Sequence, residues 1–222
     1  MAENIIFAHQ FYQMIKSYLV ALVTFTCFSA LNAQNDPAAK KIIETFGNKV
    51  KSAKGITASF VINSITSKGR AAGSKALSLS MKGELYVLKQ GKTEIICDGK
   101  SVYNFDGNKT ITKSSVEETN QTLSPQKLLA GSYDKDFAYK LISSKGAMNE
   151  IEMKPLDKRK NFVQVNIFFD KVSGNLTKAT ILDKSNNITE LKVSNINLGS
   201  VLSENLFLFN KAKYPKDVEL LD

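Results

Sequence analysis

The stretch Thr93–Phe105, TEIICDGKSVYNF, decides how this chain folds. Two runs rich in β-branched and aromatic residues flank Asp98-Gly99, a pattern that predicts two antiparallel strands joined by a tight turn. Cys97 ends the first run, and we interpret it as a buried, inert thiol. The stretch therefore predicts a β-hairpin with its cysteine inside the protein.

The same pattern recurs along most of the chain. Leu77, Leu79 and Met81 alternate with polar residues, as expected for a strand with one buried face. Short turn sequences separate the runs, and the sequence has no βαβ pattern and no internal repeat. About ten antiparallel strands at this spacing predict a large meander, sheet or barrel. The expected runs are Phe60–Ile62, Leu77–Met81, Leu85–Leu88, Thr93–Cys97, Ser101–Phe105, Thr110–Thr112, Phe137–Leu141, Ile151–Met153, Val163–Phe169, Leu176–Asp183 and Ile188–Val193.

An amphipathic helix is predicted before the first strand. Asp36 suits the N-cap and Pro37 the first helical position. Apolar residues then recur at helical spacing from Ala39 to Val50, and Gly55 would supply a left-handed C-cap. The apolar side of this helix must cover another element.

A second, two-turn helix interrupts the strand series. Ser124 is its expected N-cap and Gly131 its end, while Leu123, Leu128 and Leu129 give it an apolar side. A short helix in this position is expected to lie across a sheet face or a barrel mouth. It would act there either as part of the core or as a lid.

The first 33 residues have the pattern of a secretory signal. The apolar run Tyr18–Ala30 follows Lys16 and precedes the small-residue site Leu31-Asn32-Ala33, and Met14 begins a better signal than Met1. The run is shorter than the ~20 residues of a membrane span. We therefore expect residues 34–222 to form one domain that works in the periplasm, with an N-terminal anchor as the alternative.

The charge of the chain is strongly positive. The net charge is +9, and Arg70 and Arg159 are the only arginines, so lysine supplies almost all of the excess. Nucleic-acid binding is disfavoured, because no basic helix or aromatic–basic motif is present. The lysines would either contact anionic lipid headgroups or acidic partners, or serve as a solubilising coat.

Catalytic motifs are missing. The only histidine, His9, precedes the signal, so the mature chain has no histidine-based triad or metal site. Carboxylate pairs such as Glu117-Glu118 lie in polar contexts, and the basic turn Lys154–Lys160 is better explained as a solvated hairpin than as an anion site. We expect no enzyme, metal or cofactor. A sheet with one apolar face and two helices to cover it instead predicts a container for acyl chains.

The sequence resembles the LolA family of periplasmic outer-membrane lipoprotein carriers, in its Bacteroidetes-like version. The resemblance covers nearly all of residues 34–222, and the order and spacing of its motifs carry it. These are the N-terminal helix leading into Ile56–Phe60, the hairpin Glu94–Phe105 with its DGK turn, the helix Leu123–Leu129, the DKDF run Asp134–Phe137, the turn Asp157–Lys160, and the ending Phe207–Phe209, Tyr214-Pro215 and Val218–Asp222.

This resemblance implies a mainly β fold, an open antiparallel barrel of about eleven strands with a helical lid. It also implies a monomer that takes acylated lipoproteins from an inner-membrane ABC transporter to the outer membrane, where the acceptor is uncertain. Lys82 stands where proteobacterial members have an arginine that bonds to the lid, and lysine lacks the planar fork of arginine. The expected acyl-cavity residues are Phe60, Ile62, Leu77, Leu79, Tyr86, Ile95 and Val102, and the expected lid residues are Lys82, Leu123, Leu128 and Leu129.

Other functions remain open at this point. A general periplasmic lipid or glycolipid carrier would need the same container. A lipoprotein-sensing regulator could use the same barrel, although such proteins usually carry a second domain. A hydrolase is disfavoured because the mature chain has no histidine.

Overall fold

One continuous curved sheet dominates the computed structural model, which describes residues 35–117, 123, 125–130, 133 and 135–222. In this part of the chain the strand order is β12-β6-β5-β4-β3-β2-β1-β11-β10-β9-β8-β7, and only the β12–β6 pair is parallel. The strands are β1 (Ile56–Ile65), β2 (Ala71–Lys82), β3 (Leu85–Gln90), β4 (Thr93–Cys97), β5 (Ser101–Phe105), β6 (Thr110–Ser115), β7 (Phe137–Ser143), β8 (Met148–Pro155), β9 (Phe162–Asp170), β10 (Leu176–Asp183), β11 (Ile188–Asn197) and β12 (Glu219–Leu221).

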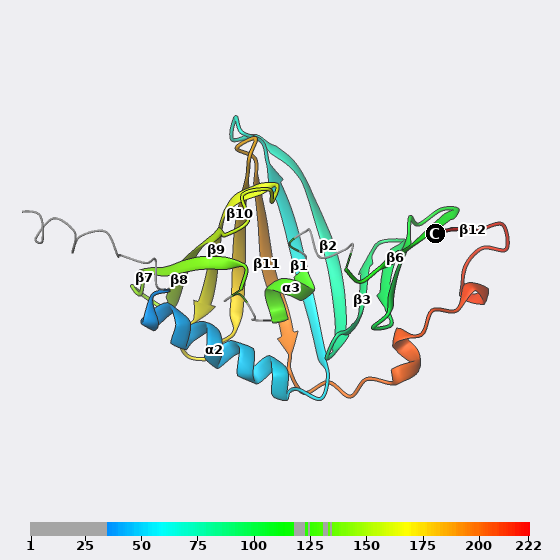
Figure 1. Cartoon of the computed structure of the whole chain (residues 1–222), viewed down its shortest axis with the longest axis horizontal. Coiled ribbons are helices and arrows are strands. Elements are labelled where there is room, and N and C mark those ends of the chain that lie inside the picture. Colours follow the sequence, from blue (N-terminus) through cyan, green and yellow to red (C-terminus); the bar gives the residue numbers. More distant parts are fainter. Residues whose placement is uncertain (1–34, 118–122, 124, 131–132, 134) are drawn as a thin grey trace, which may run out of the picture. The chain divides into compact units, whose positions relative to one another are not determined.

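The sheet is an open barrel, as the family resemblance implied. Strands β12 and β7 are its two edges, and no pairing joins them. Figure 1 shows the strands arching from β7 at one side to β6 and β12 at the other, with the long β1–β2 hairpin between them. The twelfth strand, β12, is the one that the local pattern did not reveal.

Helix α2 (Pro37–Ser52) begins as predicted and ends differently. The Asp36 carboxylate accepts a hydrogen bond from the Ala38 N–H at 2.8 Å, so it caps the helix before Pro37. The helix ends at Ser52, and Ala53 is already extended, so Gly55 is not the C-cap. Gly55 lies instead where the chain passes close to the end of β11: an added Cβ would be 2.5 Å from the Ser200 carbonyl oxygen.

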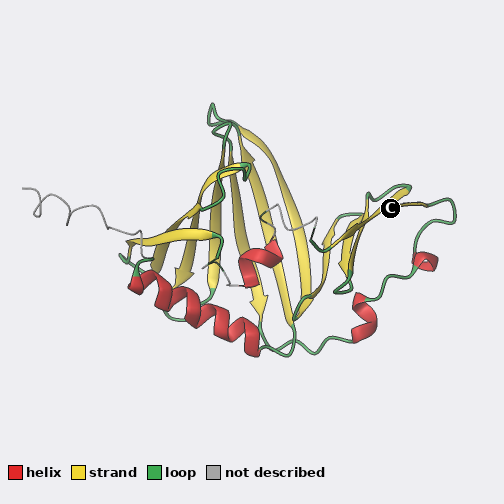
Figure 2. Ribbon diagram, viewed as in Figure 1, coloured by secondary structure: helices red, strands yellow, loops and turns green. Residues whose placement is uncertain are grey.

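The two helices lie on the same side of the sheet. Figure 2 shows α2 and the short helix α3 (Pro125–Ala130) on the concave side. Ile43, Phe46 and Val50 of α2 and Leu128 and Leu129 of α3 belong to the main core, together with inward residues of β1 to β5 and β7 to β11. The main core therefore fills the space between the concave face and the helices. The expected caps Ser124 and Gly131 lie outside the described residues.

The C-terminal segment covers the other face of β3 to β6. The short helix η2 (Glu204–Phe207) places Phe207 against Val87 and Ile96, which form a second, smaller cluster. After η2, the ring of Phe209 stacks on Tyr103 with centroids 4.0 Å apart. A further short helix, η3 (Lys211–Lys213), precedes β12. The sheet therefore has apolar cover on both faces at this side.

Residues Asn35–Asp222 form one compact unit. The expected signal segment, residues 1–33, lies outside the described residues. Within the described part, no helix combines the length and the apolarity that crossing a membrane requires.

Candidate functional site

The concave face is an apolar wall built by strand register. Phe60 is paired with Leu77, and Ala58 with Leu79, so these side chains share one face of the β1–β2 hairpin. The pairing of Leu79 with Leu88, and then of Leu88 with Ile95, continues this face through β3 and β4. Because residues paired across an antiparallel ladder point to the same side, the wall runs unbroken from β1 to β4.

The structure brings all seven residues expected to line the cavity to this face. Five are buried in the main core, and two are half-buried and pack against it. The buried five are Phe60, Leu77, Leu79, Tyr86 and Val102, and the half-buried two are Ile62 and Ile95. Their role in ligand binding is a proposal, developed below.

The prediction missed the half of the wall that the later strands supply. Ile151, Met153, Val165, Ile167 and Phe169 are all fully buried on the same face as the first set. Their period-two alternation was visible in the sequence, but nothing local showed that β8 and β9 are joined to β1 through β10 and β11. The alternation also shifts at the start of β9, where Phe162 is buried and Val163 is 41% exposed.

Helix α2 covers the part of the concave face that β9 forms. The Phe46 ring packs at 56° against the Phe169 ring, with centroids 5.4 Å apart. Beyond the helices, Ile62, Leu88, Ile95 and Ile181 remain half-buried against the core. We call these four residues the half-buried strip of the concave face.

Helix α3 is held on the concave face by leucines and by one tyrosine. Leu128 and Leu129 are fully buried, and Leu123 packs against the same core. The Tyr133 hydroxyl donates a hydrogen bond to the Leu128 carbonyl oxygen, and burial raises the pKa of this hydroxyl. The Tyr133 ring meets Phe137 edge to face at 6.2 Å. A helix of six residues is too short to be stable alone, so these contacts hold it in place.

Lys82 is not part of the lid in this structure. Its Nζ lies 2.8 Å from Oε1 of Glu204 in η2, and this ammonium lowers the pKa of the Glu204 carboxyl. The preceding residue, Met81, occupies the inward position, so alternation turns Lys82 to the face that carries the C-terminal segment. The expected bond from Lys82 to the lid is therefore corrected to an ion pair with η2.

The interior of the wall favours neutral groups. Burial raises the pKa of Tyr86 to about 12, with a further contribution from the neighbouring Cys97. Burial also raises the pKa of the Cys97 thiol, which is free. Apart from tyrosine hydroxyls and this thiol, the buried side chains of the described residues are apolar. Such a surface suits hydrocarbon, because an unpaired polar group is costly to bury there.

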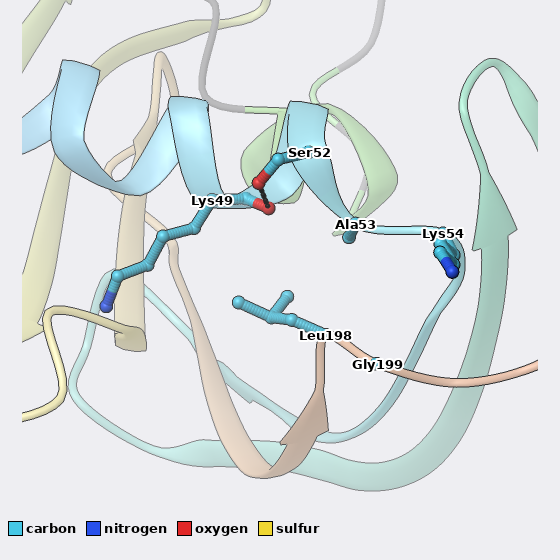
Figure 3. Close-up of a pocket in the computed structure, with 6 residues that line it drawn as sticks. All are labelled: Lys49, Ser52, Ala53, Lys54, Leu198 and Gly199. Atoms are coloured by element: carbon cyan, nitrogen blue, oxygen red, sulfur yellow. Dashed lines mark hydrogen bonds between the residues drawn. The ribbon is translucent and has the colours of Figure 1, made fainter.

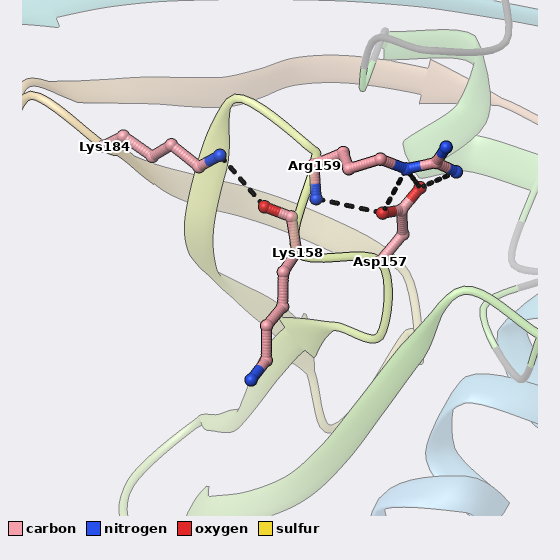
Figure 4. A network of polar contacts seen from close by, with 4 residues as sticks. All are labelled: Asp157, Lys158, Arg159 and Lys184. Carbon is pink, nitrogen blue, oxygen red and sulfur yellow. Dashed lines mark hydrogen bonds and ion pairs between the residues drawn. The ribbon is translucent and has the colours of Figure 1, made fainter.

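The basic turn between β8 and β9 pairs its arginine with its own aspartate. The Arg159 guanidinium donates from Nε and Nη2 to the Asp157 carboxylate and lowers its pKa to about 2 (Figure 4). Lys184 Nζ donates to the Lys158 carbonyl oxygen at 2.9 Å. These contacts support the interpretation as a solvated hairpin. Among the residues that the structure describes, no group of His, Cys, Asp or Glu side chains is arranged to hold a metal ion.

Comparison with known proteins identifies the family. The family model described as outer membrane lipoprotein carrier protein LolA matches residues 86–210. An uncharacterized conserved protein from Thermus thermophilus is similar in structure, with a TM-score of 0.55 at 12% identity, covering 83% of this chain and 98% of that one. No curated protein matches the sequence.

Two more distant structures have lower scores. A LolA superfamily protein from Nitrosomonas europaea is 15% identical with a TM-score of 0.45, and the match covers 77% of this chain and 97% of that one. Lipoprotein LppX from Mycobacterium tuberculosis is 13% identical with a TM-score of 0.44, and the match covers 76% of this chain and 100% of that one.

An open sheet, an apolar concave face and a covering helix together define an open β-barrel with a helical lid. Because its family model matches more than half of the sequence, the chain belongs to the LolA family of outer-membrane lipoprotein carrier proteins. Proteins of this family are binding or carrier proteins rather than enzymes.

Proposed function

We propose that this protein is a periplasmic chaperone that binds the acyl chains of lipoproteins and carries them from the inner to the outer membrane. The observation that carries the proposal is the concave face, whose apolar side chains continue from the buried core into the half-buried strip of Ile62, Leu88, Ile95 and Ile181. An acyl chain that reaches the strip could advance under α3 if this short helix moves. Membership of the LolA family supports the same cargo.

The energetics of transfer favour a container of this kind. Each buried CH₂ contributes about 0.8 kcal/mol, so two or three acyl chains anchor a lipoprotein firmly in a bilayer. A carrier must offer comparable apolar surface and still release its cargo. We propose that α3 supplies this balance, because its leucines fill the wall when the carrier is empty and are displaced when acyl chains bind.

The proposed partners follow from the direction of transport. An inner-membrane ABC transporter would release the lipoprotein and supply the energy, so binding to this protein would itself be independent of ATP. The protein would act as a monomer and pass its cargo to an acceptor at the outer membrane. No nucleic-acid role is proposed.

A second candidate function is general transport of phospholipid or glycolipid, because the apolar wall would accept any acyl chain. Native mass spectrometry of the protein purified from its own periplasm separates the two. A co-purifying triacylated lipoprotein supports the first proposal, whereas phospholipid alone supports the second. Copurification of an intact membrane regulator without lipid would instead indicate a lipoprotein-sensing role.

A further inference from the structure

Two shallow hollows line one flank of helix α2, where the helix passes the ends of β9 to β11. One, of about 340 Å³, lies between Lys49 and Lys54 and the residues Leu198 and Gly199 that follow β11. Figure 3 shows Leu198 pointing into this space beneath the helix. The other, of about 200 Å³, lies between Lys41 of the helix and Lys171 of the β9–β10 turn.

Four lysines line these hollows, and we call them the basic edge: Lys41, Lys49, Lys54 and Lys171. Among the described residues none of the four forms an ion pair. Lys49 and Lys171 donate to the carbonyl oxygens of Ser173 and Ser144, which position the ammonium groups without neutralising them. The basic edge therefore keeps its full positive charge.

The carboxylate beside the basic edge is already engaged. Asp170 lines the smaller hollow, and its Oδ1 accepts from the Ser173 N–H at 2.7 Å and from the Ser173 hydroxyl at 2.8 Å. These bonds lower the pKa of the Asp170 carboxyl. Its charge thus shapes the turn and offsets part of the field, but four ammonium groups outnumber it.

Two fully solvent-exposed valines lie at the same end of the sheet. Val172, in the β9–β10 turn, is 95% exposed, and Val201, after the end of β11, is 96% exposed. Lys49 connects the two places, because it reaches Ser173 beside Val172 and also lines the hollow with Leu198 and Gly199. Exposed apolar residues at loop tips beside lysines are the combination that interfacial membrane binding uses.

We propose that this end of the sheet docks on an anionic lipid bilayer. The basic edge would meet the headgroup phosphates, and Val172 and Val201 would enter the headgroup layer. A solubilising coat explains the lysines but not two valines almost wholly in water. An acidic protein partner would likewise not require apolar side chains at two separate loop tips. The proposal concerns the docking surface and does not depend on what the concave face binds.

Vesicle flotation with the cargo-free protein tests the proposal. Wild type is compared on vesicles of phosphatidylcholine alone and of phosphatidylcholine with phosphatidylglycerol. The edge variant carries Lys41→Gln, Lys54→Gln and Lys171→Gln. The control variant carries Lys68→Gln, Lys75→Gln and Lys92→Gln, which are also exposed and remove the same charge from the opposite part of the sheet. A third variant carries Val172→Ser and Val201→Ser, and thermal unfolding checks that all variants fold.

Wild type should bind the anionic vesicles and not the neutral ones. Three lysines within the membrane surface potential should together change the partition coefficient by about 100-fold, so the edge variant should lose most of its binding. The valine variant should lose binding about tenfold, whereas the control variant should stay within about threefold of wild type because its lysines are remote from the surface. Equal losses in the edge and control variants would overturn the proposal, as would an absence of wild-type binding.

Discussion

The carboxylate of Asp36 accepts a hydrogen bond from the backbone N–H of Leu141 at 3.0 Å, which ties the start of helix α2 to edge strand β7. The same carboxylate caps the helix through the N–H of Ala38, and the Asp36 N–H donates to the Tyr139 carbonyl oxygen at 3.2 Å. An open sheet edge exposes backbone groups that can template association with another chain. Asp36 thus covers the open edge and fixes the helix over the concave face.

Asp36→Ala should lower the free energy of unfolding by about 1–2 kcal/mol, the usual cost of losing an N-cap. The Leu141 N–H is the main cause of the lowered pKa of Asp36. The ionised Asp36 carboxylate therefore contributes its full share to the free energy of unfolding above the unfolded pKa of about 3.9. This contribution is lost as the pH falls through the lower pKa of the folded state. Urea unfolding at pH 7 and at pH 2 measures the effect, and the difference between wild type and variant should be smaller at pH 2. Glu44→Gln, on an exposed face of the same helix, is the control. A difference that grows on acidification would contradict this role.

Lys82→Gln should leave ligand binding unchanged and cost less than about 1 kcal/mol, because the Lys82–Glu204 pair is exposed to solvent. Urea unfolding and lipopeptide titration of the same sample check both statements. Glu204→Gln should behave in the same way, and the double variant should be no worse than the sum of the two. Loss of lipopeptide binding in Lys82→Gln alone would show that this lysine reaches the lid after all.

Tyr133→Phe should loosen helix α3 while leaving the barrel folded. The change removes the hydroxyl that bonds to the Leu128 carbonyl oxygen, and a typical hydrogen bond contributes about 1 kcal/mol. Hydrogen exchange read by mass spectrometry should show faster exchange in Leu128 and Leu129 and unchanged exchange in β8 and β9. If β8 and β9 exchange faster to the same extent, α3 belongs to the folding core and is not a separately opening lid.

Cys97 reports on the occupancy of the concave face. In the chain from residue 34 it is the single thiol, and it is buried with a raised pKa. It should react with a disulfide reagent far more slowly in the folded protein than in urea. A triacylated lipopeptide should slow the reaction further, and the same peptide without acyl chains should not. An unchanged labelling rate with bound lipopeptide would place the ligand elsewhere.

Local pattern predicted the strands and their buried face because both depend on neighbouring residues. The period-two runs around Leu79 and Ile95 and the N-cap at Asp36 are examples, and so is the apolar side of α3. Each needs only alternation or cap chemistry, which a single segment contains. The family resemblance then supplied the open barrel and its lid.

Long-range contacts were beyond the reach of local pattern. Lys82 contacts Glu204, which is 122 residues away in the sequence. A glycine is needed at position 55 because the Ser200 carbonyl oxygen leaves no room for a Cβ there, and not because the helix ends at this residue. Phe207 and Tyr214 cover the second face of the sheet: the Tyr214 hydroxyl donates to Oε2 of Glu94 at 2.6 Å. These contacts arise only when the chain returns across the sheet, so no local window predicts them.

The central claim is that the concave face binds acyl chains, and neighbouring residues of β1 allow a matched test of it. Ile62 and Val61 are both half-buried, but they point to opposite faces: Ile62 lies opposite Leu191, and Val61 lies opposite Lys192. An aspartate at either place introduces the same charge into the same strand. Binding of a synthetic triacylated lipopeptide to Ile62→Asp and to Val61→Asp therefore compares the two faces directly.

Isothermal titration of this lipopeptide into wild type and the two variants is the measurement. Wild type should bind, Val61→Asp should bind as wild type does, and Ile62→Asp should bind at least about tenfold more weakly, because a carboxylate is costly to bury beside hydrocarbon. Thermal unfolding should show both variants folded. Absence of binding by wild type, or equal affinities of the two variants, would contradict the account.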